Sequence, residues 1–187
     1  MNTLKAEKRS MEIKAKRLRR EGYVTGNVFG KKIQGSIPVK MEKKDVDRLL
    51  KTETKGGQIM LDVEGEVYDV LIKEVDYDAM ANQVVEIDFQ ALVSNEKVHS
   101  VAEIVLHNTE NVVEGVLEQI LKEVSYKAYP SALVDKIDVD CGNLHLGDCI
   151  RVKDLEIAKN KDISIMTNPE SIIVNVIAVH NLSLIHI

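Results

Sequence analysis

Alternating apolar and polar residues are the main pattern of this chain, and they predict a mainly β protein. The clearest example is VVEIDFQAL at 84–92, where every second residue is apolar, so one face of a strand would be buried and the other polar. The same period predicts strands in the first half of the chain over residues 2–9, 23–30, 33–40, 58–63 and 66–73. The pair Glu64-Gly65 separates the last two and predicts a hairpin turn.

Three features qualify these strands. Pro38 lacks an N–H group, which predicts that its strand lies at a sheet edge. Gly26 and Gly30 in the 23–30 strand allow a bulge or a close backbone approach. Residues 76–83 are polar and predict a loop.

Two stretches have a helical period instead. Residues 11–21 place Met11, Ala15 and Leu18 on one narrow apolar stripe, and a glycine follows where a helix C-cap belongs. Residues 43–50 have apolar side chains at helical spacing and predict a second helix. The fold class that follows is α+β, mainly β with a few short helices.

The second half of the chain predicts a separate β domain. Alternation indicates strands over residues 98–106, 137–140, 149–152 and 171–179. Residues 112–128 fit either a helix or a bent strand, and their Val and Tyr content favours the strand. A polar break near residue 94 predicts domains at 1–93 and 94–181. The apolar tail at 182–187 is either a last strand edge or a read-through scar, and we favour the scar.

Composition is ordinary for a globular protein, with 44% hydrophobic and 29% charged residues. With no Trp and two Phe, the core must be aliphatic. No apolar run approaches the roughly 20 residues that span a bilayer, and the N-terminus lacks the apolar stretch of a secretory signal. We therefore expect a cytoplasmic protein that binds neither membranes nor a small-molecule substrate.

Sites for catalysis or metal binding are not indicated. There is no glycine-rich phosphate loop, zinc-protease motif or nucleophile elbow, and the histidines lack ligand spacing. Cys141 and Cys149 fit neither a disulfide framework nor a zinc pattern. Residues 138–148 look like a calcium loop, but Gly142 occupies a position that should supply an oxygen ligand and no glutamate closes the loop. Glu86 and Asp88, on one strand face, are weak candidates for acid–base catalysis, so we expect a non-enzymatic protein without cofactors.

Charge is distributed unevenly along the chain, whose formal net charge is −5. Residues 1–55 contain 16 Lys and Arg against 7 Asp and Glu, whereas residues 56–187 contain 9 against 23. The most basic stretch is KAKRLRREG at 14–22, in which five of the first seven residues are Lys or Arg. A short basic cluster in an acidic protein is typical of phosphate binding, and so of nucleic acid; a solvated helix face is the alternative.

The basic stretch has side chains suited to RNA. Arg presents a planar fork of donors that matches phosphate oxygens. Phe29 and Tyr23 would stack on a base or ribose, although Phe29 fits the core or its rim equally well. Asp88 would accept hydrogen bonds from base amino groups or 2′-hydroxyls. The helix residues predicted to project outward are Lys16, Arg17, Arg19 and Arg20.

Several segments, taken in order, resemble a single family. The segments of the first half are LKAEKR (4–9), KRLRREG (16–22), VFG (28–30) and EIDFQ (86–90), which are similar to its first strand, basic helix and two later strands. The segments EGVLEQIL (114–121), IDVD (137–140) and LHLGDCIRVKDL (144–155) are similar to the second half of its longer form. The family is the bacterial large-subunit ribosomal protein L-twenty-five, including the two-domain form called Ctc or general stress protein.

The resemblance implies a six-stranded barrel-like N-terminal domain with helices, and a second, mostly β domain. It also implies binding of 5S ribosomal RNA within the large ribosomal subunit. Carried over by position, the RNA-binding residues are Arg9, Lys14, Lys16, Arg17, Arg19, Arg20, Phe29 and Asp88. In this set the helix residues hold the phosphate backbone, and Arg9 and Lys14 flank them.

The chain departs from the family pattern at Asp76 and Glu86, where the family has Gln and His on the RNA-facing surface. Two acids there would weaken phosphate contact and flatten the salt dependence of binding. Two hypotheses follow. The first is a structural ribosomal protein that binds 5S RNA with residues 1–93. The second is a divergent stress-related paralogue that acts as a protein-interaction module with weak or no RNA binding.

Overall fold

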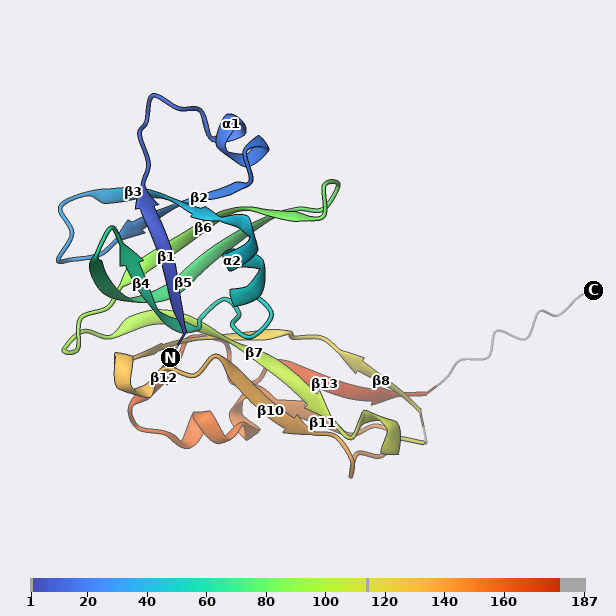
Figure 1. Cartoon of the computed structure of the whole chain (residues 1–187). Helices are drawn as coiled ribbons and strands as arrows, with labels where there is room; N and C mark the ends of the chain where they lie inside the picture. Colours follow the sequence, from blue (N-terminus) through green and yellow to red (C-terminus); the bar gives the residue numbers. More distant parts are fainter. Residues whose placement is uncertain (1, 114, 179–187) are drawn as a thin grey trace, which may run out of the picture.

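The computed structural model describes residues 2–113 and 115–178, which form two β domains (Figure 1). The N-terminal domain is a closed barrel of six strands in the order β1-β3-β2-β6-β5-β4. Its strands are β1 (Thr3–Lys8), β2 (Tyr23–Phe29), β3 (Ser36–Glu42), β4 (Gln58–Val63), β5 (Glu66–Asp78) and β6 (Gln83–Ala91). Neighbouring strands run antiparallel, except that β1 pairs with β4 and β2 with β6 in parallel.

The barrel interior is filled by alternate residues from all six strands, as a two-residue period requires. Apart from Phe89 and Met41, these buried side chains are aliphatic. Gly26 of β2 faces this interior where β2 meets β6. A Cβ atom at this position would lie 1.9 Å from the carbonyl oxygen of Ile87. The predicted close backbone approach is therefore confirmed. It lies between β2 and β6, one of the two parallel pairs of the barrel.

Two helices accompany the barrel (Figure 1). Helix α1 (Ala15–Arg20) connects β1 to β2, and helix α2 (Lys43–Leu49) connects β3 to β4. Helix α2 packs Val46 and Leu49 into the same hydrophobic cluster as the barrel strands. The second predicted helix is thus confirmed, and its apolar face helps to fill the barrel.

The second domain contains two sheets, in the orders β10-β7-β9-β12 and β11-β13-β8. Its strands are β7 (Val98–His107), β8 (Val116–Gln119), β9 (Glu123–Ala128), β10 (Lys136–Asp140), β11 (Cys149–Arg151), β12 (Ile163–Ile165) and β13 (Ile172–Ile177). Short 3-10 helices connect them: η1 (Thr109–Asn111), η2 (Pro130–Ala132), η3 (Val152–Asp154) and η4 (Glu156–Lys159). Both sheets contribute to one hydrophobic cluster, so they are two layers around a shared core.

The predicted strands correspond to observed ones, and the mainly β fold class is confirmed. The helical alternative for residues 112–128 is wrong, because that segment forms β8 and β9. The edge position predicted from Pro38 is also wrong: β3 lies between β1 and β2, since closure of the barrel leaves none of its six strands at an edge. Strand β12 was not predicted.

Two boundaries also differ from the prediction. The first helix begins at Ala15 rather than Met11, and Met11 is 72% exposed, so it does not belong to an apolar stripe. The loop predicted at 76–83 is shorter, because β5 continues to Asp78 and β6 begins at Gln83. The prediction about residues 182–187 lies outside the described residues.

Helix α1 lies at the end of the barrel remote from the second domain, as Figure 1 shows. The last barrel strand ends at Ala91 and the first strand of the second domain begins at Val98. No helix within the described residues is both long enough and apolar enough to cross a membrane.

Candidate nucleic-acid interface

Helix α1 is a short basic helix whose ends follow from local geometry. Lys14 is its N-cap, with extended backbone angles (φ −63°, ψ 137°), and the first turn closes by a hydrogen bond from the Arg17 N–H to the Lys14 carbonyl. The helix stops at Gly22, whose φ of +89° is left-handed and favours glycine. Its last turn carries three arginines, which suit the negative end of the helix dipole.

The helix rests on the outside of the barrel. Leu18 is buried (3% exposed) but is not part of the barrel's interior cluster. Thr25 has the outward parity of β2, opposite to that of the interior residues Val24 and Val28, yet it is fully buried. Leu18 and Thr25 are therefore covered where α1 packs on the outer face of β2. This single apolar anchor leaves the rest of the helix surface to its basic side chains.

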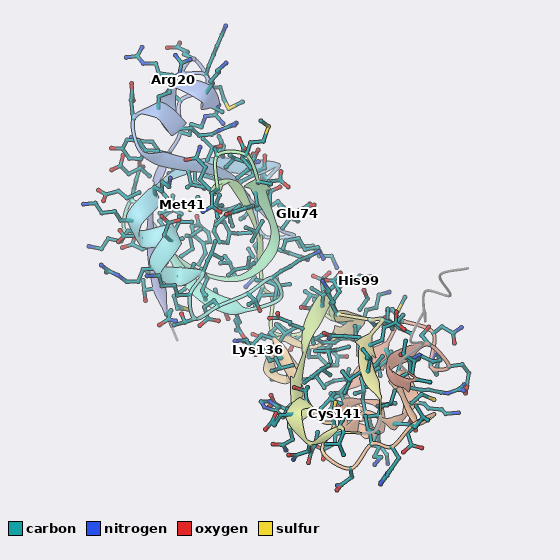
Figure 2. All side chains as sticks on the ribbon, turned by 90° about the vertical axis from the view of Figure 1, so that its right-hand side faces the viewer. Arg20, Met41, Glu74, His99, Lys136 and Cys141 are labelled. Carbon is teal, nitrogen blue, oxygen red and sulfur yellow. The ribbon has the colours of Figure 1, made fainter. Side chains whose placement is uncertain are left out.

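Most of the basic side chains of α1 project into solvent. Arg17 is 73% exposed and forms one ion pair, from its Nε to the Glu21 Oε1 at 2.9 Å. Lys14, Lys16 and Arg20 are exposed, and within the described residues no carboxylate lies within ion-pair distance of them. Figure 2 shows Arg20 at the outer tip of the barrel domain.

Arg9 and Arg19 differ from the other predicted basic residues because they are half-buried. In each, the Nε–H group is buried and has no hydrogen-bond partner within the described residues. The Arg9 guanidinium also donates a bond of 3.2 Å to the carbonyl of Ile13, which ties the loop before α1 to the end of β1. A buried, unpaired donor is costly, by about 1–3 kcal/mol, and calls for a functional or structural explanation.

Phe29 and Asp88 lie on the same barrel wall but away from the helix. Phe29 is the last residue of β2, six residues or roughly 20 Å beyond Tyr23, where the strand leaves α1. It is half-buried and is not part of the interior cluster. Asp88 lies opposite Asn27, and its carboxylate accepts hydrogen bonds from the Asn27 backbone N–H and side-chain amide, both at 3.1 Å. One role of Asp88 is thus to join β6 to β2.

Across this wall the charge passes from positive on β3 to negative on β6 and β5. Lys40 of β3 lies opposite Thr25 of β2, which lies opposite Glu86 of β6, which lies opposite Asp76 of β5. One step along, Asp88 lies opposite Glu74. Directly opposed residues share a face. The outer wall therefore carries an acidic quartet, defined as Glu74, Asp76, Glu86 and Asp88, beside the strand on which α1 rests.

Lys40 was not among the predicted site residues. Its ammonium lies 2.8 Å from the Glu7 carboxylate and 4.6 Å from the centre of the Tyr23 ring. The hydrogen bond to Glu7 raises the pKa of Lys40, so the side chain stays charged. A lone Lys in a strand gives no sequence signal; only the pairing of β3 with β2 reveals that it adjoins the helix.

Within residues 2–113 and 115–178, no cluster of three His, Cys, Asp or Glu side chains is arranged to hold a metal ion. Cys141 is buried and Cys149 half-buried, and both are free thiols. Burial raises the pKa of the Cys141 thiol, which makes it a poor nucleophile. Glu86 and Asp88 face outward on the barrel wall, with Asp88 held by Asn27.

Comparison with known proteins covers both domains. Residues 4–89 match the model of the Ribosomal L25p family, and residues 97–180 match that of Ribosomal protein TL5, C-terminal domain. Large ribosomal subunit protein bL25 of Carboxydothermus hydrogenoformans is 33% identical over 159 residues, which cover 84% of this chain and 78% of that protein. The Bacillus pumilus protein of the same name is 29% identical over 181 residues, covering 95% and 86%.

A third relative of that name, from a Thermoanaerobacter species, is 27% identical over 167 residues, which cover 88% of this chain and 82% of the relative. The matches to these relatives extend through both domains. The chain therefore belongs to the family of large ribosomal subunit protein bL25, in the two-domain form that carries a TL5-type C-terminal domain.

Proposed function

We propose that this protein is a structural, non-enzymatic component of the large ribosomal subunit that binds 5S ribosomal RNA through α1 and the adjoining wall of the barrel. The observation that carries the proposal is the exposed basic helix, held on β2 by Leu18. Family membership supports the ribosomal role, because the relatives are named as proteins of that subunit.

The contacts divide by chemistry. The exposed ammonium and guanidinium groups of α1 hold RNA phosphates, which are read as charge and not as sequence. The residues assigned to this role are Lys14, Lys16, Arg17, Arg19 and Arg20. Arg17 must exchange its Glu21 partner for phosphate or share it. Such an exchange costs little free energy, because exposed ion pairs contribute little to stability.

The unpaired buried Nε–H groups support the same proposal. Arg9 and Arg19 are the two arginines with such a group within the described residues. They belong to the end of β1 and to α1, which are the segments assigned to RNA contact. An RNA oxygen that reaches these donors after a small side-chain movement satisfies them, so part of the cost of the free state is recovered on binding.

The barrel wall adds contacts of another kind. Carboxylates cannot bind phosphate, but Asp88 retains lone pairs that accept from guanine amino groups or 2′-hydroxyls. Phe29 has a half-buried ring at the end of β2, suited to packing against a ribose or a base. Any RNA on this wall must therefore direct hydrogen-bond donors at Asp88 and keep its phosphates away from the carboxylates of Asp76 and Glu86.

A mobility-shift titration of the purified full-length protein against 5S RNA, at several salt concentrations, tests the proposal. We expect binding whose affinity falls steeply as salt rises, because several phosphate contacts release counterions. Loss of binding in a folded protein, or binding indifferent to salt, would contradict it.

The divergent-paralogue hypothesis is the second candidate, favoured by the acidic quartet beside the basic helix. Under this hypothesis the quartet repels RNA and the protein interacts with other proteins. Sucrose-gradient fractionation of cells distinguishes the two candidates. Steady migration with the large subunit at raised salt supports the ribosomal role, whereas recovery only at the top of the gradient supports the paralogue.

A further inference from the structure

The junction between the two domains is closely packed. Gly56, in the loop before β4, has a φ of +91°, and a Cβ atom there would lie 2.0 Å from the carbonyl oxygen of Val101 in β7. Lys73 of β5 donates a hydrogen bond of 2.8 Å to the carbonyl of His99, also in β7. The barrel and the second domain are therefore in direct contact at Gly56 and at Lys73.

A cavity of about 260 Å³ lies at this junction. The polar and charged residues that line it include Lys55, Lys73, Glu74, His99, Ser100 and Ser125. A third lysine, Lys127, lies directly opposite His99 on β9. Figure 2 shows His99 at the end of the second domain that faces the barrel.

The cluster is cationic in a part of the chain that is otherwise acidic. Lys55 and Lys73 line the cavity, and Lys127, 72 positions after Lys55 in sequence, lies beside it opposite His99. Within the described residues, none of the three has a carboxylate within ion-pair distance, although Glu74 lines the same cavity. Two lysines and one acid, Glu74, line the cavity, so the lining has an excess of positive charge, and Lys127 adds a third ammonium beside it. Glu103 and Glu123 lie in the neighbouring hollow that Lys55 also lines.

The pKa values of Lys73 and His99 reflect the positive charges near them. Burial, and then the neighbouring charge of Lys55, lower the pKa of Lys73. Burial also lowers the pKa of His99, and Lys127 and Lys73 lower it further. Like charges are thus held together without a full set of counter-ions, an arrangement that an oxyanion stabilises.

We infer that this junction cavity is a second anion site, which binds a backbone phosphate of the same RNA that α1 holds. The inference rests on the proposed function. The ammonium of Lys73 keeps two N–H donors beyond its bond to His99, and Lys55 and Lys127 add point charges. Ser125 also lines the cavity, and its hydroxyl group is a further donor.

RNA is the favoured source of the phosphate for two reasons. The site and α1 belong to one molecule, so an RNA held by the helix presents its other phosphates at high effective concentration. A duplex also carries regularly spaced phosphates, so that a site at the other end of the barrel from α1 can be occupied without any change in the protein (Figure 1). A free phosphate has neither advantage.

The test uses the full-length double variant Lys55→Gln/Lys127→Gln, which removes two charges that, within the described residues, make no hydrogen bond or ion pair across the junction. The matched control is Lys161→Gln, an exposed lysine in the loop between η4 and β12, outside the cavity. We expect the double variant to bind 5S RNA roughly three- to tenfold more weakly per lost contact at low salt, with a salt slope smaller by about one per phosphate contact. The control should match the wild type.

A second measurement separates the sources of phosphate and detects loss of folding. Amide resonances of Gly56 and of residues 99–101 are followed by NMR during addition of inorganic phosphate, and then of RNA. Chemical-shift changes that RNA causes in the wild type but not in the double variant support the inference, provided that the other resonances keep their positions. Chemical-shift changes with inorganic phosphate alone, together with unchanged RNA affinity of the double variant, overturn it.

Failure of the inference is distinguishable from failure of the proposed function. If the wild type binds 5S RNA and the double variant binds equally well, only the junction site is wrong. If the wild type does not bind 5S RNA, the proposed function is wrong, and the RNA-phosphate assignment at the junction is overturned with it.

Discussion

The barrel has two halves that share one hydrophobic interior and differ in surface charge. In barrel order, β1, β3 and β2 are neighbours, and so are β6, β5 and β4. The first group and its helices belong to residues 1–55, with 16 Lys and Arg against 7 Asp and Glu. Residues 56–93, which form the second group, contain nine Asp and Glu, and Lys73 is their single Lys or Arg.

The charge boundary therefore lies inside the barrel and not between the domains. Residues 1–93 as a whole carry 17 Lys and Arg against 16 Asp and Glu, nearly a balance. A uniform barrel with those totals would attract a polyanion weakly from every side. Segregation gives it one attractive half and one repulsive half, which orients a polyanionic partner before any contact forms. The halves meet at two parallel pairings, β1 with β4 and β2 with β6, and the second of these is called the seam below.

The basic half is tested most strongly by the double variant Arg17→Ala/Arg19→Ala. Each arginine is expected to contribute about 1–3 kcal/mol to RNA binding, as charge-assisted contacts do. Filter binding against 5S RNA measures the loss. The matched control is Arg48→Ala in α2, an 83% exposed arginine of the same half whose Nη1 atom lies 4.0 Å from the Asp45 carboxylate. Equal losses in both variants would indicate a diffuse charge effect and not a site on α1.

The seam is tested by Gly26→Ala. The new methyl group meets the backbone oxygen of Ile87, which cannot move aside without separating β2 from β6. We expect a loss of about 3 kcal/mol in the free energy of unfolding, measured by urea denaturation. Gly65→Ala is the comparison: its φ of +94° introduces conformational strain of about 1 kcal/mol, but nothing lies within 4 Å of the new atom. A smaller loss at Gly26 than at Gly65 would show that the seam yields easily.

The acidic half is tested by Asp76→Asn/Glu86→Gln. These residues lie directly opposite each other on β5 and β6, so the double variant removes a like-charge pair from the wall that adjoins α1. We expect 5S RNA affinity to rise roughly two- to fivefold at low salt, with a smaller gain at high salt because exposed charges are screened. A fall in affinity would mean that the carboxylates accept hydrogen bonds from the RNA.

The smallest expected effect concerns acids outside the barrel. Glu170 accepts hydrogen bonds from Lys153 at 2.9 Å and Arg151 at 2.8 Å, and these bonds, first that from Lys153, lower its pKa below the usual 4.5. Its stabilising effect is present above pH 4.5 and is lost as the pH falls through the lowered pKa.

Urea unfolding of the wild type and Glu170→Gln at pH 7 and at pH 3 measures this contribution. The two proteins should differ slightly at pH 7 and converge at pH 3. A difference that persists unchanged at pH 3 would assign the effect of the substitution to packing and not to charge. The result also sharpens the contrast with the barrel, whose acidic quartet lies next to like charges.

Much of the fold was predictable from local patterns. Two-residue alternation identified most strands, because a strand with one buried face must alternate whatever its neighbours are. The glycine after α1 and the basic composition of that helix were equally visible, as both depend on a few adjacent residues. The same stretch supported the family resemblance, which the comparisons confirm over both domains.

Other features depend on contacts between distant segments and have no local signal. Local pattern placed the start of α1 at Met11; in the structure the helix begins at Ala15, after a loop that the Arg9 side chain ties to β1. Pro38 resembled an edge residue, yet barrel closure gives β3 two neighbours. Strand β12 has three residues, too few to show a period, and forms by pairing with β9.

The sequence alone thus determined the strand content, the basic helix and the unequal charge of residues 1–55 and 56–187. Each of these is a property of consecutive residues. Tertiary structure alone decided that the charge boundaries are the β2–β6 and β1–β4 pairings, that Lys40 adjoins α1, and that Lys55, Lys73 and Lys127 come together at the domain junction. These results depend on strand order and register. Pairing selects register through the packing of whole faces, and no single segment contains that information.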